Sequence, residues 1–429
     1  MIPAVGAIGL LGAWIYARSK FSTWSGAIVL LIGFTLTVCG VIVNVDYYTD
    51  VLGGSLASPV LNNYDSSVDW QRAMIYLGAP ENPELPHRYY SAVIAVLTWI
   101  FGVDISVPLL FNSLCYVLLL VVMGAIGWQL TESRKVATAL MAITLCMCYL
   151  LVQSTVLIKD VPLTLVVALV VLLSIMWMKT FWWKTPWWQY LAMLALMVVL
   201  QFLRVNFAPI LCVGALLFSL RFRPFSIDPR FVGVIVIATV FRWIFNQWFV
   251  EPGSVAQIVA VKYTGSIQLF EPHTMAWDNM TGVYSQLSVF QRIAWLPMSV
   301  GVQYMIPFPW TYMSYVDFSP LMSLAHFGFP WYYAGALVVY WIFADMRHAD
   351  AGMIKLVAWG VAATVATAYV TGGHASRYCL PYLPMLLPAA AWVVCHDLHR
   401  RKLWIWLGIF TVLLVVALVV GHRLQTQYL

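Results

Sequence analysis

Two aspartates stand beside long apolar stretches of the chain, where a charged side chain is costly to keep near lipid. Asp160 follows Lys159 in "LIKDVPLTL", at the start of an apolar run, and Asp65 lies in the polar string "NNYDSSVDWQRAMIYLG". A carboxylate can accept the proton of a hydroxyl nucleophile, and two carboxylates can share a hard divalent cation such as magnesium or manganese. Asp65 and Asp160 are therefore the first candidates for catalytic and metal-binding residues.

Basic side chains stand in the connections that contain these two aspartates and in two later connections between apolar runs. Arginine binds a phosphate group through two parallel hydrogen bonds, and lysine binds it as a compact charge. A substrate that carries a phosphate would therefore suit this set. The candidate substrate-binding residues are His87, Arg88, Lys159, Arg204 and Arg377.

The same residues also have purely structural explanations. Asp65 and Asp160 each precede an expected helix, so each would also serve as an N-cap. Lys159 would also reach the membrane interface with its charged end while its stem stays in apolar surroundings. Asp46 and Asp69 are weaker alternatives for a catalytic base. The residue types alone leave these roles open.

The composition of the chain places these residues in a membrane protein. Of 429 residues, 62% are hydrophobic and 9% are charged, whereas about a quarter of the residues of a soluble domain are charged. Apolar runs of roughly 16 to 23 residues recur, which is the length that a membrane-spanning helix needs. We predict an all-α polytopic fold with eleven or twelve transmembrane helices in a single transmembrane domain, residues 1–429. The candidate spans are residues 2–17, 26–45, 107–130, 136–155, 161–178, 187–203, 207–221, 231–249, 322–343, 353–371, 379–395 and 403–421.

The distribution of charge predicts how these spans cross the membrane. Lysine and arginine occupy alternate connections, which are therefore predicted to be cytoplasmic. Most acidic residues fall in the other connections, on the outer face. The basic turn "TESRK" can lie inside only if residues 89–103 enter and leave on the same side, as a juxtamembrane or re-entrant helix. Residues 46–106 then form a first outer loop and residues 250–321 a second. The expected location is the cytoplasmic (inner) membrane, with the site facing the periplasm or outside, although an endoplasmic reticulum membrane would give the same bias.

Several common functions lack their motifs in this chain. It contains no GxxxxGK[ST] or GxGxxG phosphate loop, no HExxH metal motif and no GxSxG nucleophile elbow. The seven cysteines all fall in or beside candidate spans and are interpreted as small core residues, not as disulfides. The net charge of +6 comes mainly from residues that flank the spans, so it does not indicate binding to nucleic acid.

The first outer loop resembles that of a known class of enzymes. Asp65 is followed by Trp70 and Ala73, and some twenty residues later His87 and Arg88 open a short helix that ends in "TWIFG". This order of residues resembles the first outer loop of integral-membrane glycosyltransferases of the GT-C class, which include the lipid A aminoarabinose transferases and the protein mannosyltransferases.

Three further elements resemble the same class. The string "STVLIKDVPLTL" is similar to its second outer loop, where an aspartate precedes a span, and "LQFLRVNFAPI" places Arg204 at an outer helical hairpin. The string "GGHASRYCLPYLP", with Arg377, is similar to an R-Y-x-x-P-x-x-P element of such enzymes. Two departures exist: the first motif has no acidic pair, and no proline directly follows His87.

The resemblance implies a GT-C-like helical bundle whose two outer loops contain juxtamembrane helices. It also implies a transferase that moves a sugar from a polyprenyl-phosphate donor to a lipid, glycan or protein acceptor on the outer face, among membrane lipids. Two other functions stay open. One is a polymerase or ligase of lipid-linked oligosaccharides, and the other is a transporter or flippase of a lipid or polysaccharide, which would place ionisable residues at mid-span.

Overall fold

The computed structural model describes the chain in segments that form two compact units. Unit 1 comprises Met1–Met176, Pro307–Ala358 and Leu380–Leu429, and unit 2 comprises Trp177–Ile306 and Trp359–Cys379. Within the described residues the regular elements are all helices. The described residues are 2–46, 64–77, 89–180, 184–203, 230, 233–234, 236–237, 240, 288–305, 329–371, 380–396 and 400–428.

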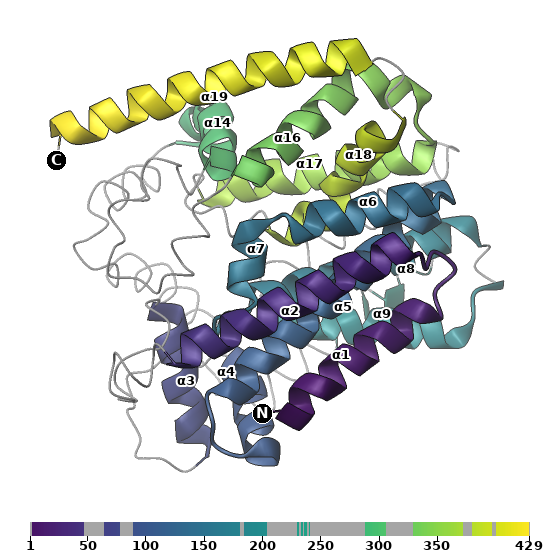
Figure 1. The fold of residues 1–429 in the computed structure, drawn as a ribbon, viewed down its shortest axis with the longest axis vertical. Coiled ribbons are helices and arrows are strands. Elements are labelled where there is room, and N and C mark those ends of the chain that lie inside the picture. Colours follow the sequence, from purple (N-terminus) through teal and green to yellow (C-terminus); the bar gives the residue numbers. More distant parts are fainter. Residues whose placement is uncertain are drawn as a thin grey trace. The chain divides into compact units, whose positions relative to one another are not determined.

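Figure 1 labels the longer helices, and most of the helices belong to unit 1. Its N-terminal part contains α1 (Ile2–Ala17), α2 (Trp24–Asp46), α3 (Tyr64–Tyr76), α4 (Tyr89–Phe101), α5 (Ser106–Thr131), α6 (Arg134–Leu145) and α7 (Cys148–Gln153). Its C-terminal part contains α16 (Phe329–Tyr340), the π-helix η5 (Trp341–Asp345), η6 (Met346–His348), η8 (Leu380–Tyr382), α18 (Leu383–His396) and α19 (Arg400–Tyr428). Unit 2 contains α9 (Trp187–Leu203) and α14 (Val289–Met305), while α8 (Asp160–Lys179) and α17 (Ala351–Thr371) begin in unit 1 and end in unit 2.

Four of the described helices are long and apolar enough to cross a membrane. They correspond to Trp24–Val45, Ser106–Thr131, Asp160–Lys179 and Ala351–Tyr369. Large apolar side chains on α2 remain exposed, such as Leu31 at 63% and Ile28 at 55%. Long helices with apolar surfaces of this kind require lipid around them. The chain is an all-α, membrane-embedded protein, as its composition predicts.

The predicted spans agree with the helices wherever both are described, with one exception. Spans 26–45, 107–130, 161–178, 187–203 and 353–371 correspond closely to α2, α5, α8, α9 and α17. Candidate span 207–221 and most of 231–249 lie outside the described residues, so the predicted total of eleven or twelve extends beyond them. The second predicted outer loop is described only at 288–305, where α14 contains Pro297 within an apolar helix.

The exception is the candidate span 136–155, which is interrupted. Met147 adopts φ −73° and ψ 80°, outside the helical range, so α6 ends before it and α7 begins after it. Thr144 Oγ1 donates to the carbonyl four residues earlier at 2.8 Å, a bond that tends to bend helices. The buried Tyr116 hydroxyl donates to the carbonyls of Thr144 and Leu145 at 3.4 Å each. These carbonyls lie at the end of α6, where the regular helical bonds stop, and the Thr144 carbonyl also accepts from Met147 N at 3.1 Å. Tyr116 therefore adds a donor at the break.

Glycines allow α5 and α6 to pack closely. A Cβ atom on Gly127 of α5 would lie 3.0 Å from the Cα atom of Ala137 in α6. A Cβ atom on Gly124 would lie 2.8 Å from Met141 Sδ, also in α6. Small residues at helix contacts are typical of membrane proteins, because close van der Waals packing replaces the hydrophobic driving force that water supplies elsewhere.

We predict that Gly127→Leu destabilises unit 1. The added side chain has no space beside Ala137, and overpacking of this kind costs about 1 to 3 kcal/mol. Gly408→Leu in α19 is the matched control, because a Cβ atom there would meet nothing within 4 Å. Thermal unfolding of the detergent-solubilised protein measures the difference. Equal melting temperatures for the two variants would contradict the close packing of α5 and α6.

Candidate functional site

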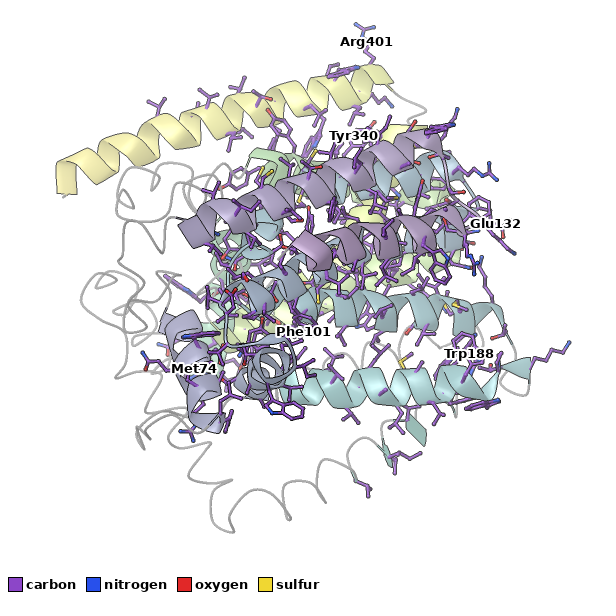
Figure 2. The ribbon with its side chains drawn as sticks, turned by 60° about the horizontal axis from the view of Figure 1, so that its bottom comes forward. Met74, Phe101, Glu132, Trp188, Tyr340 and Arg401 are labelled. Atoms are coloured by element: carbon purple, nitrogen blue, oxygen red, sulfur yellow. The ribbon has the colours of Figure 1, made fainter. Side chains whose placement is uncertain are left out.

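The helices α3 and α4 form a pair at one end of unit 1. Figure 2 shows Met74 of α3 and Phe101 of α4 at the end opposite to Glu132, which caps the C-terminus of α5. The helix α4 has 13 residues, or about 20 Å of helix, which is shorter than the ~30 Å hydrocarbon core of a bilayer. The juxtamembrane or re-entrant placement of residues 89–103 stays a prediction.

Asp69 joins α3 to α4. Its side chain is 1% exposed, and the hydroxyl of the fully buried Ser91 donates to Asp69 Oδ1 at 2.9 Å. A buried carboxylate is tolerated only when it has hydrogen-bond or charge partners. Asp69 therefore anchors α3 on the first turn of α4.

Tyr90, the neighbour of Ser91, connects α4 to α5 and to the chain that precedes α8. Its hydroxyl donates to Asn112 Oδ1 at 2.8 Å and lies 3.4 Å from the carbonyl oxygen of Ile158. The amide of Asn112 in turn donates to the carbonyls of Val156 and Ile158, at 2.6 and 3.0 Å. These bonds link α4, α5 and the approach to Asp160.

Asp160 is the first residue of α8 and is 3% exposed. The first backbone bond of the helix runs from Leu163 N to Lys159 O at 2.9 Å, so Lys159, not Asp160, takes the cap position that accepts this bond. This placement argues against the N-cap explanation of Asp160. Its Oδ2 atom is buried and has no hydrogen-bond partner among the described residues. A carboxylate oxygen without a hydrogen bond is costly to bury. A ligand that supplies a hydrogen-bond donor or a positive charge would offset this cost.

The carboxylates of Asp69 and Asp160 both act on the Tyr90 hydroxyl. Burial raises the pKa of Tyr90 well above its usual value, the charge of Asp69 raises this pKa further, and the charge of Asp160 does so to a smaller extent. Tyr90 therefore stays protonated at physiological pH and remains a hydrogen-bond donor.

The structure describes only some of the predicted site residues. Lys159 is half-buried beside Asp160. Asp65 lies in the first turn of α3, one helical turn before Asp69, and its side chain is outside the described set. His87, Arg88, Arg204 and Arg377 lie outside the described residues, as does the side chain of Asp46.

Four polar residues of this region are absent from the sequence-based site: Asn44, Tyr90, Ser91 and Asn112. The two asparagines carry a signal in the sequence, because they lie inside the predicted spans 26–45 and 107–130, where a polar amide needs a partner. Ser91 and Tyr90 carry no such signal, since either residue is common at the membrane interface.

Asp160 is the described residue best suited to a predicted magnesium or manganese ion. A carboxylate oxygen without a donor is a typical ligand for such hard cations. Among the described residues, no group of three or more His, Cys, Asp or Glu side chains gathers around a metal-sized site. Magnesium sites commonly use only one or two carboxylates and take further ligands from water and from substrate phosphates, so Asp160 fits this kind of site.

Comparison with known protein families, with curated proteins and with solved structures gave no match. The described fold and site define the class of protein as an all-α membrane protein with a buried polar site at one end of unit 1.

Proposed function

We propose that the chain is a glycosyltransferase that moves a sugar from a polyprenyl-phosphate donor to a lipid, glycan or protein acceptor on the outer face of the membrane. The observation that carries the proposal is Asp160, whose buried Oδ2 lacks a hydrogen-bond donor at the start of an apolar helix. The resemblance of four sequence elements to GT-C enzymes, Asp160 among them, supports the same reaction.

The proposed reaction exchanges one bond at the anomeric carbon of the sugar. The acceptor oxygen bonds to this carbon, the bond from the carbon to the donor phosphate breaks, and the polyprenyl phosphate leaves with the electron pair. Asp65 takes the proton of the acceptor hydroxyl. We assign this role to Asp65 because Asp69 Oδ1 already accepts a hydrogen bond from Ser91.

Asp160 has a different role in this proposal. Positive charge develops at the anomeric carbon when the leaving group departs, and a fixed carboxylate stabilises it. A bound magnesium or manganese ion, held by Asp160 and Asp65, would neutralise the leaving phosphate. The basic side chains would hold that phosphate before and after transfer, and they are His87, Arg88, Lys159, Arg204 and Arg377.

The distribution of charge in unit 1 supports an outward-facing site. Arg134 and Lys135 lie two and three residues after Glu132, which is at the end of α5 opposite to α3 and α4. Basic residues favour the cytoplasmic side, so the end with Asp69 and Asp160 would face outward. The proposed location is the cytoplasmic (inner) membrane.

A reconstituted reaction tests the proposal. The probe is the polyprenyl-phosphate-linked sugar that accumulates in cells lacking the chain, purified from their membranes and radiolabelled. Purified protein in liposomes should move the label to acceptors extracted from the same cells. Transfer of a whole oligosaccharide would instead indicate a polymerase or ligase. Movement of intact labelled lipid between leaflets, without transfer, would indicate a flippase and would overturn the proposal.

A further inference from the structure

The chain between α7 and α8 has irregular backbone in a buried position. Residues 154–158 form no helix, yet their exposures are between 0 and 3%. In a membrane protein, buried carbonyl groups outside helices need donors from elsewhere in the protein. Two asparagine side chains supply such donors, one from α2 and one from α5.

Asn112 is completely buried and holds the part of this segment nearest to Asp160. Its amide group donates to the carbonyls of Val156 and Ile158 at 2.6 and 3.0 Å, and its Oδ1 accepts from Tyr90 at 2.8 Å. A carbonyl can only accept a hydrogen bond. The amide nitrogen must therefore face the two carbonyls, and the Tyr90 hydroxyl occupies the one remaining side, so the side chain has a single favourable orientation.

Asn44 holds the other end of the segment. Its amide donates to the carbonyl oxygen of Thr155 at 2.8 Å and to Thr155 Oγ1 at 3.0 Å. Asn44 is 2% exposed, so its burial resembles that of Asn112. It contacts a residue five positions before Asp160, whereas Asn112 contacts Ile158, two positions before Asp160.

We infer that Asn112 is a positioning residue for Asp160, an inference that rests on the proposed function. Asn112 fixes the backbone that leads into α8, and Tyr90 fixes Asn112. The adjacent Ser91 binds Asp69 of α3, the helix that also carries Asp65. Through these bonds α5 sets the start of α8 relative to α3, and hence the position of Asp160 relative to the proposed base. A displacement of about 1 Å in a catalytic group can cost about 10²-fold in rate.

The test compares Asn112→Leu with Asn44→Leu, which removes a similar number of side-chain hydrogen bonds from the same segment. Both variants should lower the melting temperature by similar amounts. With the purified polyprenyl-phosphate-linked sugar described above as donor, Asn112→Leu should lower kcat by about 10- to 100-fold. Its KM for the donor should change less than threefold, because the buried Asn112 does not face a substrate. Asn44→Leu should keep kcat within threefold of the original protein.

A second variant covers the case in which Asn112→Leu does not fold. Tyr90→Phe retains the ring and removes only the hydroxyl that orients Asn112, and we expect it to lower kcat by about 3- to 10-fold at unchanged KM. Unchanged kcat in Asn112→Leu or, if that variant is unfolded, in Tyr90→Phe would overturn the inference, as would equal losses of kcat in Asn112→Leu and Asn44→Leu. Absence of sugar transfer by the original protein, with the same donor and acceptor extract, would instead overturn the proposed function. The two failures are therefore distinguishable.

Discussion

Asp160→Asn is expected to lower the rate of sugar transfer by about 10²- to 10³-fold, the usual cost of losing one fixed electrostatic group in an active site. The substitution preserves size and removes the negative charge. Asp160 Oδ2 has no hydrogen-bond donor among the described residues, so the loss of charge breaks no described bond at that atom. The measurement is the initial rate of label transfer from the purified polyprenyl-phosphate-linked donor.

The stability of this variant supplies its control. The hydrogen bond that the Thr164 hydroxyl donates to the Asp160 carbonyl oxygen, at 2.7 Å, does not depend on the carboxylate. Loss of a negative charge at the start of α8 costs about 0.3 to 1 kcal/mol of favourable interaction with the helix dipole. The melting temperature should therefore change little. A folded Asp160→Asn protein with the original rate would remove Asp160 from the site.

Asp65→Asn is expected to lower the rate by about 10²- to 10⁴-fold, because a general base contributes that much to catalysis. Asp69→Asn is its matched control, one helical turn away in α3. The asparagine would retain an acceptor oxygen for the Ser91 hydroxyl, so α3 should remain anchored on α4. We expect Asp69→Asn to lower the rate less than tenfold. Rates at a range of pH values measure both variants, and the acidic limb of the profile should disappear only in Asp65→Asn.

A larger loss of rate in Asp69→Asn than in Asp65→Asn would assign the role of general base to Asp69. Asp69 is buried near Tyr90, and its charge acts on the same hydroxyl as that of Asp160. If Asp69→Asn loses transfer while Asp65→Asn retains it, with both proteins folded, then Asp69 is the base and the hydrogen bond from Ser91 orients it.

The apolar pattern of the sequence predicts most of the described fold. The helices α2, α5 and α8 coincide with uninterrupted apolar runs of the sequence. Such runs form helices in lipid because a helix satisfies the backbone N–H and C=O groups internally. The same reasoning fails at the break between α6 and α7, because "ITLCMCYLL" is as apolar as its neighbours. There the hydroxyl of Tyr116, a residue distant in the sequence, donates to the carbonyls at the end of α6.

The sequence predicts the charged residues of the proposed site, but it does not predict the polar residues that form hydrogen bonds around them. Asp160 is noticeable because a charge beside an apolar run is costly. By contrast, the contacts of Asn112 with Val156 and Ile158 join residues more than forty positions apart. Such contacts depend on how α5 packs beside the segment before α8. The hydrophobic pattern of the sequence does not determine which residues of these two elements lie opposite each other. The burial of Asp69 depends on the packing of α3 on α4 in the same way.

Analysis of the cell-envelope saccharides is the most direct test of the proposed function. Cells that lack the chain are complemented either with the original protein or with Asp160→Asn at equal expression, and mass spectrometry compares their envelope glycans and polyprenyl-phosphate lipids. We expect that in cells without the chain one saccharide disappears and its lipid-linked donor accumulates. The original protein should reverse both changes, and Asp160→Asn should reverse neither. Unchanged saccharides in the absence of the chain would contradict the proposed function, and full restoration by Asp160→Asn would contradict the proposed role of Asp160.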